Sequence, residues 1–153
     1  MRGLDAKRGA MKIHHTAVCT RDMDTSLRFW QDGLGFVQKM DTSFDGDWPT
    51  LFGARQQRLR SIFLGDPDIE ESGIVELVEF SGGMADAPTP PSEPAIGFFL
   101  VSVYLQIEPT LARLASLSLG GTPARISLEG GVQMAVVHDP NGVTVELIDH
   151  GEG

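Results

Sequence analysis

Apolar residues in the first half of the chain form short runs separated by glycine, proline and aspartate. Residues 13–20 are rich in β-branched side chains, which predicts a strand. From Met23 the apolar positions recur at three- and four-residue steps, which predicts a helix over about 25–31, stopped by Gly33 and Gly35. Three more strands are predicted at 36–40, 58–64 and 74–80, with a loop at 45–49. This half is therefore predicted to be β-α-β-β-β.

The second half repeats that order after a segment rich in proline. Residues 87–94 contain four prolines and predict a semi-rigid linker. A strand is predicted at 97–105, followed by a helix that begins near Pro109 and ends at Gly120 and Gly121. Three strands at 124–128, 132–137 and 143–149 complete the series, the last two joined by a tight turn. The second half is also predicted to be β-α-β-β-β.

Short sequence matches support an internal repeat. Asp-Pro, a turn and then Val-Glu-Leu occur in both halves, so that Glu76 aligns with Glu146. In the same alignment residues 15–18 lie over 98–101. The predicted fold class is α+β, with two βαβββ modules whose mixed sheets curve around a cleft. The expected division is an N-terminal extension at 1–11, a first module at 12–86, a linker at 87–95 and a second module at 96–150.

Composition and net charge limit the classes of partner that the chain is expected to bind. The 153 residues include 12 Lys and Arg against 21 Asp and Glu, a formal net charge of −9. A chain of this charge without a basic run is repelled by nucleic acid and by anionic membranes, so neither is expected as a partner. No apolar run approaches the roughly 20 residues of a spanning helix, and no secretory signal precedes the first strand, so a cytoplasmic location is expected. Cys19 is the single cysteine, which excludes disulfides within the chain.

Three residues have the chemistry of a reactive site. Glu76 and Glu146 each lie in the middle of an apolar strand, so each carboxylate must face either solvent or a polar cavity. His15 lies in the first strand and is either a hydrogen-bonded core residue or a ligand. If the three converge on the cleft, they have the ligand types of a site for nickel, cobalt, zinc, iron or manganese.

The sequence resembles the vicinal oxygen chelate superfamily, which includes glyoxalase I, methylmalonyl-CoA epimerase, extradiol dioxygenases, fosfomycin-resistance enzymes and bleomycin-resistance proteins. The resemblance covers roughly residues 12–150, and its motifs are specific for the fold only when taken together and in order. The matching segments are Ile13-His14-His15-Thr16-Ala17-Val18, Asp22-Met23-Asp24, Phe29-Trp30, Leu34-Gly35-Phe36, Val75-Glu76-Leu77, and Asp139-Pro140-Asn141-Gly142-Val143-Thr144-Val145-Glu146-Leu147.

This resemblance implies one metal ligand from each first strand and one from each fourth strand. His15, Glu76 and Glu146 match three of these positions, and Phe98 falls at the fourth, where a benzyl ring cannot bind a metal. A divalent nickel, zinc, iron or manganese ion is therefore implied with an incomplete ligand set. An extradiol dioxygenase, which needs two histidines and one carboxylate, ranks below the other family activities. The family also implies a homodimer.

Two functions follow from the resemblance. The first is a glyoxalase-like, metal-dependent lyase or isomerase that acts on a small substrate with vicinal oxygens, with Glu76 or Glu146 moving a proton between neighbouring carbons. The second is a metal-free, bleomycin-resistance-like protein that binds a small molecule between apolar walls. In that case the apolar walls are supplied by Phe98, Phe99, Trp48, Phe52 and Phe44.

Overall fold

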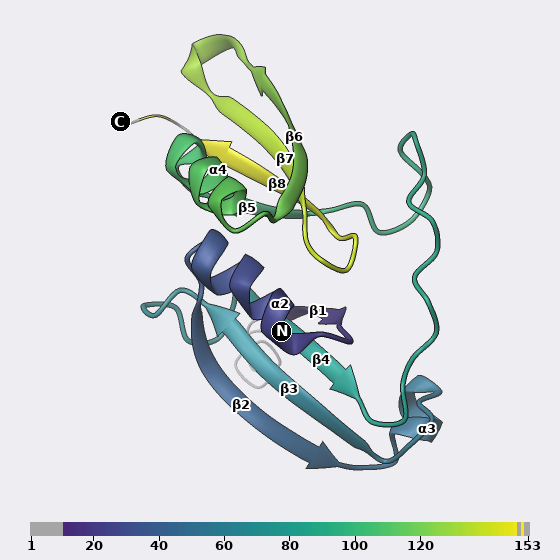
Figure 1. Ribbon diagram of the computed structural model, residues 1–153. Coiled ribbons are helices and arrows are strands. Elements are labelled where there is room, and N and C mark those ends of the chain that lie inside the picture. Colours follow the sequence, from purple (N-terminus) through teal and green to yellow (C-terminus); the bar gives the residue numbers. More distant parts are fainter. Residues whose placement is uncertain (1–10, 150, 152–153) are drawn as a thin grey trace, which may run out of the picture.

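The computed structural model describes residues 11–149 and 151, which form two four-stranded mixed sheets (Figure 1). In the first sheet the order is β1-β4-β3-β2, and β1 is parallel to β4. In the second sheet the order is β5-β8-β7-β6, and β5 is parallel to β8. The strands are β1 His15–Cys19, β2 Val37–Asp45, β3 Arg58–Gly65, β4 Ile74–Phe80, β5 Val101–Tyr104, β6 Gly120–Ser127, β7 Gln133–His138 and β8 Thr144–Asp149. The predicted fold class is confirmed.

Each module carries its helix between the first two strands. In the first module α2, Met23–Leu27, continues into the π-helical η1, Arg28–Gly33, so the predicted helix at 25–31 is extended at both ends. The Asp22 side chain caps α2 by accepting a hydrogen bond from the Thr25 amide. In the second module α4, Ile107–Ser116, buries Ile107, Thr110 and Leu114.

The two helices join the modules into one hydrophobic core. Phe29 and Trp30 are fully buried and share that core with Leu114 of α4 and with the inner faces of both sheets. Gly33 lies directly under Leu114, and a Cβ there would clash with that side chain. The Trp30 indole donates to Asp139 Oδ2 at 3.3 Å. Burial of large side chains at this junction supplies most of the packing between the modules.

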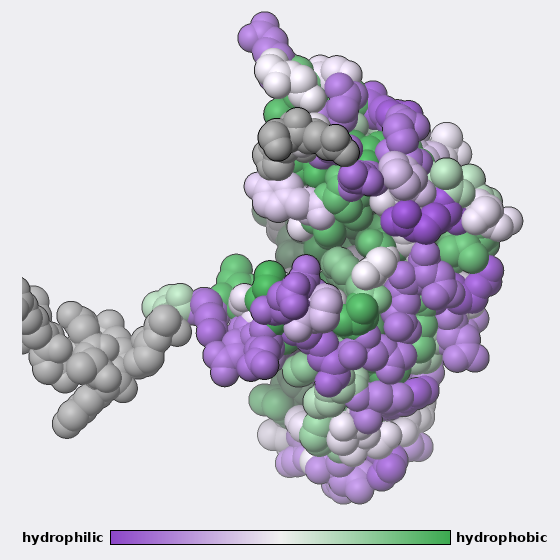
Figure 2. All heavy atoms as spheres, turned by 90° about the vertical axis from the view of Figure 1, so that its left-hand side faces the viewer, coloured by the Kyte–Doolittle hydropathy of each residue, from purple (hydrophilic) through white to green (hydrophobic). Residues whose placement is uncertain are grey.

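The outer surface around this junction is mostly polar. Figure 2 shows a face covered largely by hydrophilic residues, with hydrophobic ones gathered toward its middle. None of the helices in the described part of the chain is long and apolar enough to cross a bilayer. The expected cytoplasmic location stays a prediction, and residues 1–10 of the expected N-terminal extension lie outside the described residues.

Several element boundaries differ from the predictions. Strand β2 continues to Asp45, and the predicted loop at 45–49 leads into the short helix α3, Trp48–Phe52. Both ends of α3 are capped in a common way. The Asp47 side chain accepts a hydrogen bond from the Thr50 amide at the N-terminus, and Gly53 adopts a φ of 70° at the C-terminus. The predicted strand at 97–105 is wrong outside Val101–Tyr104, since residues 81–100 form neither helix nor strand. That segment is a long connection between the modules (Figure 1).

The strand pairing also corrects the alignment of the repeat. Glu76 pairs with Ala17 across β1 and β4, whereas Glu146 pairs with Ser102 across β5 and β8. The residue two positions before Ser102 therefore corresponds to His15, and that residue is Leu100 rather than Phe98. The aligned glutamates themselves are equivalent, because Glu76 faces Phe63 in β3 and Glu146 faces Val136 in β7.

Candidate active site

A cavity of about 1380 Å³ lies on the face of the first sheet opposite the one that packs in the core with η1 and α4. Alternation along the strands places every second residue on this face, so that His15, Ala17 and Cys19 of β1 line the cavity together with Glu76 of β4. The volume exceeds the roughly 300–1,000 Å³ of an ordinary small-molecule site. Four of the predicted site residues line it: His15, Glu76, Trp48 and Phe52.

The polar centre of the cavity is a pair formed by His15 and Glu76. Nε2 of His15 lies 3.6 Å from Oε1 of Glu76, and the side chains are 37% and 17% exposed. The Ser61 hydroxyl donates to the other carboxylate oxygen, Oε2, at 2.5 Å. Nδ1 of His15 is 2.8 Å from Nδ1 of His14. One oxygen of Glu76 and one nitrogen of His15 are thus held in position while both remain accessible from the cavity.

Cys19 lies on the same face and is not an activated nucleophile. Desolvation within the cavity raises the pKa of its thiol, and the negative charge of Glu76 raises that pKa further. The thiolate is the reactive form of cysteine, and a raised pKa keeps the thiol protonated at neutral pH.

Aromatic side chains form one wall of the cavity. The rings of Trp48 and Phe52 in α3 are stacked, with centroids 5.7 Å apart and planes at 15°. Phe52 meets Phe80 of β4 edge to face, with centroids 6.0 Å apart. Phe44 of β2 also lines the cavity. The sequence predicts Trp48 and Phe52 as binding residues, but the helix that pairs them was not predicted.

The connection between the modules passes along the rim of the cavity. Arg21 donates to the backbone carbonyl of Met84 at 2.7 Å and forms an ion pair with Asp86, also at 2.7 Å. Met84, Ala85 and Ala87 line the cavity as a result. The start of the predicted linker is therefore held against the site by a charged pair.

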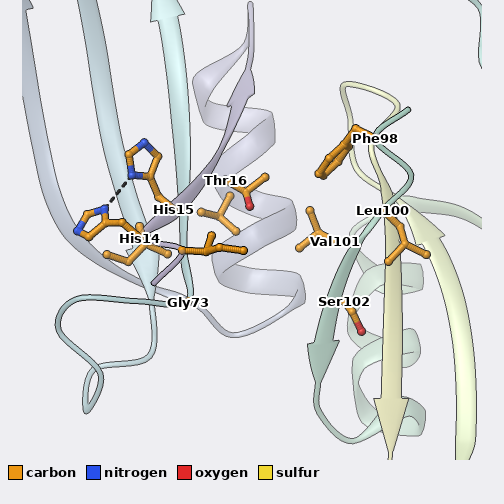
Figure 3. Close-up of a pocket in the computed structure, with 11 residues that line it drawn as sticks. His14, His15, Thr16, Gly73, Phe98, Leu100, Val101 and Ser102 are labelled. Carbon is orange, nitrogen blue, oxygen red and sulfur yellow. Dashed lines mark hydrogen bonds between the residues drawn. The ribbon is translucent and has the colours of Figure 1, made fainter. Parts of the chain in front are cut away.

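Two other predicted site residues lie elsewhere. Glu146 is on the second sheet, where it accepts a hydrogen bond from the Ser102 hydroxyl at 2.8 Å, and it does not line the large cavity. Phe98 lines a smaller cavity of about 320 Å³ between β1 and β5, which His15 also lines. In Figure 3 the rings of His14 and His15 extend away from Phe98 and Ser102 across that cavity. One chain therefore brings Phe98 and His15 to the same smaller cavity but does not bring Glu146 to the His15–Glu76 pair.

The donor set of one chain does not fit a divalent metal. Such an ion needs at least three converging nitrogen or oxygen ligands from the protein. His15 and Glu76 supply two, whereas residues 11–149 and 151 contain no group of three or more His, Cys, Asp and Glu side chains that could hold an ion. Leu100, at the position corresponding to His15 in the second module, has no donor atom.

Strand alternation was the signal that could have identified the residues missed from sequence. Ser61 and Phe63 lie two apart in β3, on the face that carries Glu76, and Ser61 is 1% exposed. Phe80 lies four residues after Glu76 in the same strand and so shares its face. Parity from Glu76 therefore predicts the face of Phe80, whereas Ser61 and Phe63 also require the register between β3 and β4.

Comparison with known proteins supports this architecture. The family model described as Glyoxalase/Bleomycin resistance protein/Dioxygenase superfamily matches residues 12–147. The chain is 36% identical over 146 residues to the lactoylglutathione lyase-like protein terB of Aspergillus terreus, covering 89% of the chain and 74% of that protein. It is 25% identical over 140 residues to lactoylglutathione lyase of Haemophilus influenzae, covering 92% and 93%.

Solved structures show the same fold at lower identity. A glyoxalase family protein from Bacillus cereus superposes with a TM-score of 0.75 at 18% identity, covering 94% of this chain and 97% of that one. A trypanothione-dependent glyoxalase I from Leishmania major superposes with a TM-score of 0.61 at 20% identity, covering 92% and 88%.

Proposed function

Since the chain belongs to the glyoxalase/bleomycin resistance protein/dioxygenase superfamily, we propose that it is a lyase or isomerase in which His15 and Glu76 are the catalytic residues. Relatives named as lactoylglutathione lyases support a glyoxalase-like lyase at the level of the family, whose proteins act on small molecules. The observation that carries the proposal is the 3.6 Å separation of His15 Nε2 and Glu76 Oε1 in the large cavity.

The proposed chemistry is transfer of a proton between adjacent carbons of the substrate. Oε1 of Glu76 removes a proton from the carbon next to a carbonyl, and the electrons of that C–H bond form the double bond of an enediolate. Nε2 of His15 donates a hydrogen bond to the developing oxyanion. Glu76 then returns the proton to the neighbouring carbon, while Nε2 of His15 gives its proton to the former carbonyl oxygen and takes the proton of the substrate hydroxyl, so that the carbonyl and hydroxyl groups exchange places. Ser61 keeps the carboxylate oriented throughout, because its hydroxyl occupies Oε2.

The proposal includes a homodimer. The outer face of the second sheet carries a row of side chains formed by Tyr104, Ile148, Met134 and Ile126, of which Tyr104 and Ile126 are 72% and 58% exposed. Glu146 lies in the adjacent row. An apolar sheet face of this kind is typical of a surface that another chain covers. A second copy that placed this face over the large cavity would set Glu146 opposite His15 and Glu76.

A bound metal ion is proposed for that homodimer and not for a single chain. Members of the glyoxalase family generally use a divalent metal, and His15, Glu76 and Glu146 are the expected ligands. A bound ion would act as a Lewis acid on two substrate oxygens. One chain supplies only two of those ligands, so the proton transfer described above is assigned to His15 and Glu76 without the ion.

A second candidate, a metal-free binding protein, is favoured by the aromatic wall of Trp48, Phe52 and Phe80. An aromatic wall of this kind can hold a ligand whether or not the protein then converts that ligand. The two candidates differ in turnover, because a binding protein does not exchange a carbon-bound proton with solvent.

The test measures that exchange. A panel of α-hydroxyketones and of thiohemiacetals of 2-oxoaldehydes is incubated with the protein in D₂O, and loss of the carbon-bound proton is followed by ¹H NMR. Glu76→Gln is expected to slow exchange by at least about 100-fold, the lower range for removal of a general base. Glu79→Gln is the matched control, because it lies on the same strand but not in the cavity. Equal rates in both variants would overturn the proposal.

A further inference from the structure

The aromatic wall of the large cavity is unusual in its exposure. Phe52 is 59% exposed and Phe44 is 40% exposed, although both are large apolar side chains. Trp48 and Phe52 are stacked, and Phe80 meets Phe52 edge to face. An exposed, contiguous aromatic surface that lines a cavity is the usual mark of a ligand contact rather than of core packing.

The wall is also held in a fixed shape. The Trp48 indole donates to the backbone carbonyl of Phe44 at 3.2 Å, which fixes the ring against β2. The short helix α3 is capped by Asp47 at one end and by Gly53 at the other. A preformed aromatic surface loses little conformational entropy when a ring stacks on it.

The second module has no counterpart of this wall. Between β6 and β7 it has only the three-residue turn η2, Glu129–Gly131, where the first module has α3 between β2 and β3. The repeated fold therefore does not need a helix at this position. The aromatic wall is an addition to the one module that carries the His15–Glu76 pair.

The charges around the cavity do not suit an anionic ligand. Among the described lining residues two carry a permanent positive charge, Arg21 and Arg55. Arg21 is paired with Asp86 and with the Met84 carbonyl. Arg55 donates to the neutral Gly82 carbonyl at 3.4 Å, so it is one cation for the two carboxylates of a glutathione adduct. A glutathione adduct brings two carboxylates, which proteins bind with free cationic donors. The formal charge of −9 opposes such a ligand further.

The two arginines of β3 near the cavity do not supply further unpaired positive charge. Arg58 is paired with Asp45 at 2.9 Å, and Arg60 is paired with Asp41 at 2.8 Å. Each positive charge on this part of β3 is therefore matched by a carboxylate of β2. The site recognises its ligand mainly through ring contacts and through the polar pair.

From these observations we infer that the cavity takes an uncharged ring compound, aromatic or alicyclic, with adjacent oxygen functions, and does not take a glutathione adduct. The ring lies against Trp48 and Phe52, and the oxygens reach His15 and Glu76. This inference rests on the proposed function for the reacting end of the ligand. The aromatic wall and the shortage of cations in the cavity carry the rest of it.

Binding of two probes tests the inference by isothermal titration calorimetry at pH 7. The first probe is 2,3-dihydroxynaphthalene, an uncharged ring with adjacent oxygens, and the second is S-lactoylglutathione. We expect the dihydroxynaphthalene to bind at least about 10-fold more tightly than the glutathione thioester. Phe52→Ala is expected to weaken binding of the dihydroxynaphthalene by about 10-fold, in line with the loss of one stacked ring. Because Phe52 is largely exposed, its removal leaves the core intact.

Leu51→Ala is the matched control. Leu51 lies in the same helix and is 65% exposed, but it does not line the cavity. We expect this variant to bind the dihydroxynaphthalene within twofold of the unchanged protein. Three results would each overturn the inference: equal or tighter binding of S-lactoylglutathione, no binding of the dihydroxynaphthalene, or equal effects of Phe52→Ala and Leu51→Ala.

The same titrations in Glu76→Gln separate the two proposals. This variant lacks the base but keeps the aromatic wall, so binding of the dihydroxynaphthalene should be retained. Retained ring binding without any proton exchange by the unchanged protein would leave the ligand class standing and remove the proposed lyase or isomerase. Proton exchange together with preferred binding of S-lactoylglutathione would support the proposed lyase or isomerase and overturn the inferred ligand class.

Discussion

The two modules share a plan but differ in what they add to it. Each has a parallel first and fourth strand, one helix on the inner face, and a glutamate in the middle of the fourth strand that accepts a hydrogen bond from a serine. In the described part of the chain, the first module adds an imidazole beside its glutamate and an aromatic helix above it, and the second module adds neither. The second has Leu100 at the position that corresponds to His15 and a three-residue turn in place of α3. The repeat therefore builds the scaffold, and two local changes turn one copy of it into a candidate active site.

The comparison between the modules assumes that they share one hydrophobic core and unfold together. Leu114 of α4 is 1% exposed and packs over Gly33 of the first module. We expect Leu114→Ala to lower the free energy of unfolding by about 2–5 kcal/mol, the range for a buried leucine that leaves a cavity. Leu51→Ala, at an exposed site, should change it by less than about 0.5 kcal/mol.

Urea denaturation followed by circular dichroism and by tryptophan fluorescence measures both values. Trp30 lies at the junction and Trp48 lies at the cavity, so fluorescence reports on two parts of the molecule. Coincident transitions by the two methods are expected, because the core is continuous across the modules. Two separate transitions would mean that each module folds alone.

The two serine–glutamate pairs are expected to differ in strength. Ser61 is 1% exposed and donates to Glu76 at 2.5 Å, whereas Ser102 is exposed and donates to Glu146 at 2.8 Å. Removing a hydrogen bond to a charged group costs about 1.5–3 kcal/mol when the site is buried. We expect Ser61→Ala to reach that range in urea denaturation, and Ser102→Ala to stay below about 1 kcal/mol.

The same variants also distinguish a role of Ser61 in orienting the Glu76 carboxylate from a role in the stability of the fold. Ser61→Ala should lower kcat more than it raises KM, because a freely rotating carboxylate is a poorer base in the transition state. Ser61→Thr, which keeps a hydroxyl, should restore most of the loss. A Ser102→Ala variant with the larger effect would reverse the comparison between the modules.

Giving the second module the missing imidazole tests the corrected alignment of the repeat. In the proposed homodimer, Leu100→His adds a nitrogen donor beside Glu146, and we expect the affinity for nickel to rise by about 10-fold. Phe98→His is the matched control, because the alignment of sequence motifs assigns Phe98 to the same position. Calorimetric titration with Ni²⁺ measures both. A larger gain from Phe98→His would restore the alignment that the strand pairing replaced.

Much of the fold could be predicted from the sequence because periodicity and turn residues act locally. The Val-Glu-Leu repeat placed Glu76 and Glu146 at equivalent positions, as the pairing with β3 and β7 confirms. The alignment of His15 with Phe98 failed because residues 81–100 leave the sheet before β5 begins at Val101. No local pattern marks where a strand acquires its partner, so a shift of two residues keeps the same alternation of faces.

The site was harder to predict than the fold because its parts are distant in sequence. His15, Ser61 and Glu76 meet only through the β1-β4-β3 order, which no single motif encodes. The helix α3 had readable signals in Asp47, Pro49 and Gly53, but at five residues it is too short for a hydrophobic period. Sequence therefore supplied the reactive residue types, and the topology selected which of them share a cavity.

Surface charges offer the smallest expected difference between the modules. Arg60 hydrogen-bonds Asp41 in the first module and lowers the pKa of that carboxyl. A pKa that is lowered in the folded state adds stability above the pKa of the unfolded chain, about 3.9, and this stability is lost as the pH falls through the folded pKa. The two side chains are 40% and 39% exposed, so solvent screening keeps the contribution below about 1 kcal/mol.

Asp41→Asn is therefore expected to lower the free energy of unfolding slightly at pH 7 and to leave it unchanged near pH 2, where the unchanged protein has also lost the pair. Glu108→Gln is the control in the second module, since Glu108 pairs with Arg125 at a more exposed position. Urea titrations at both pH values measure the difference. A loss that is equal at pH 7 and pH 2 would show that Asp41 stabilises the β2–β3 pair through packing or neutral hydrogen bonds, because the ionic contribution must vanish when the carboxyl is protonated.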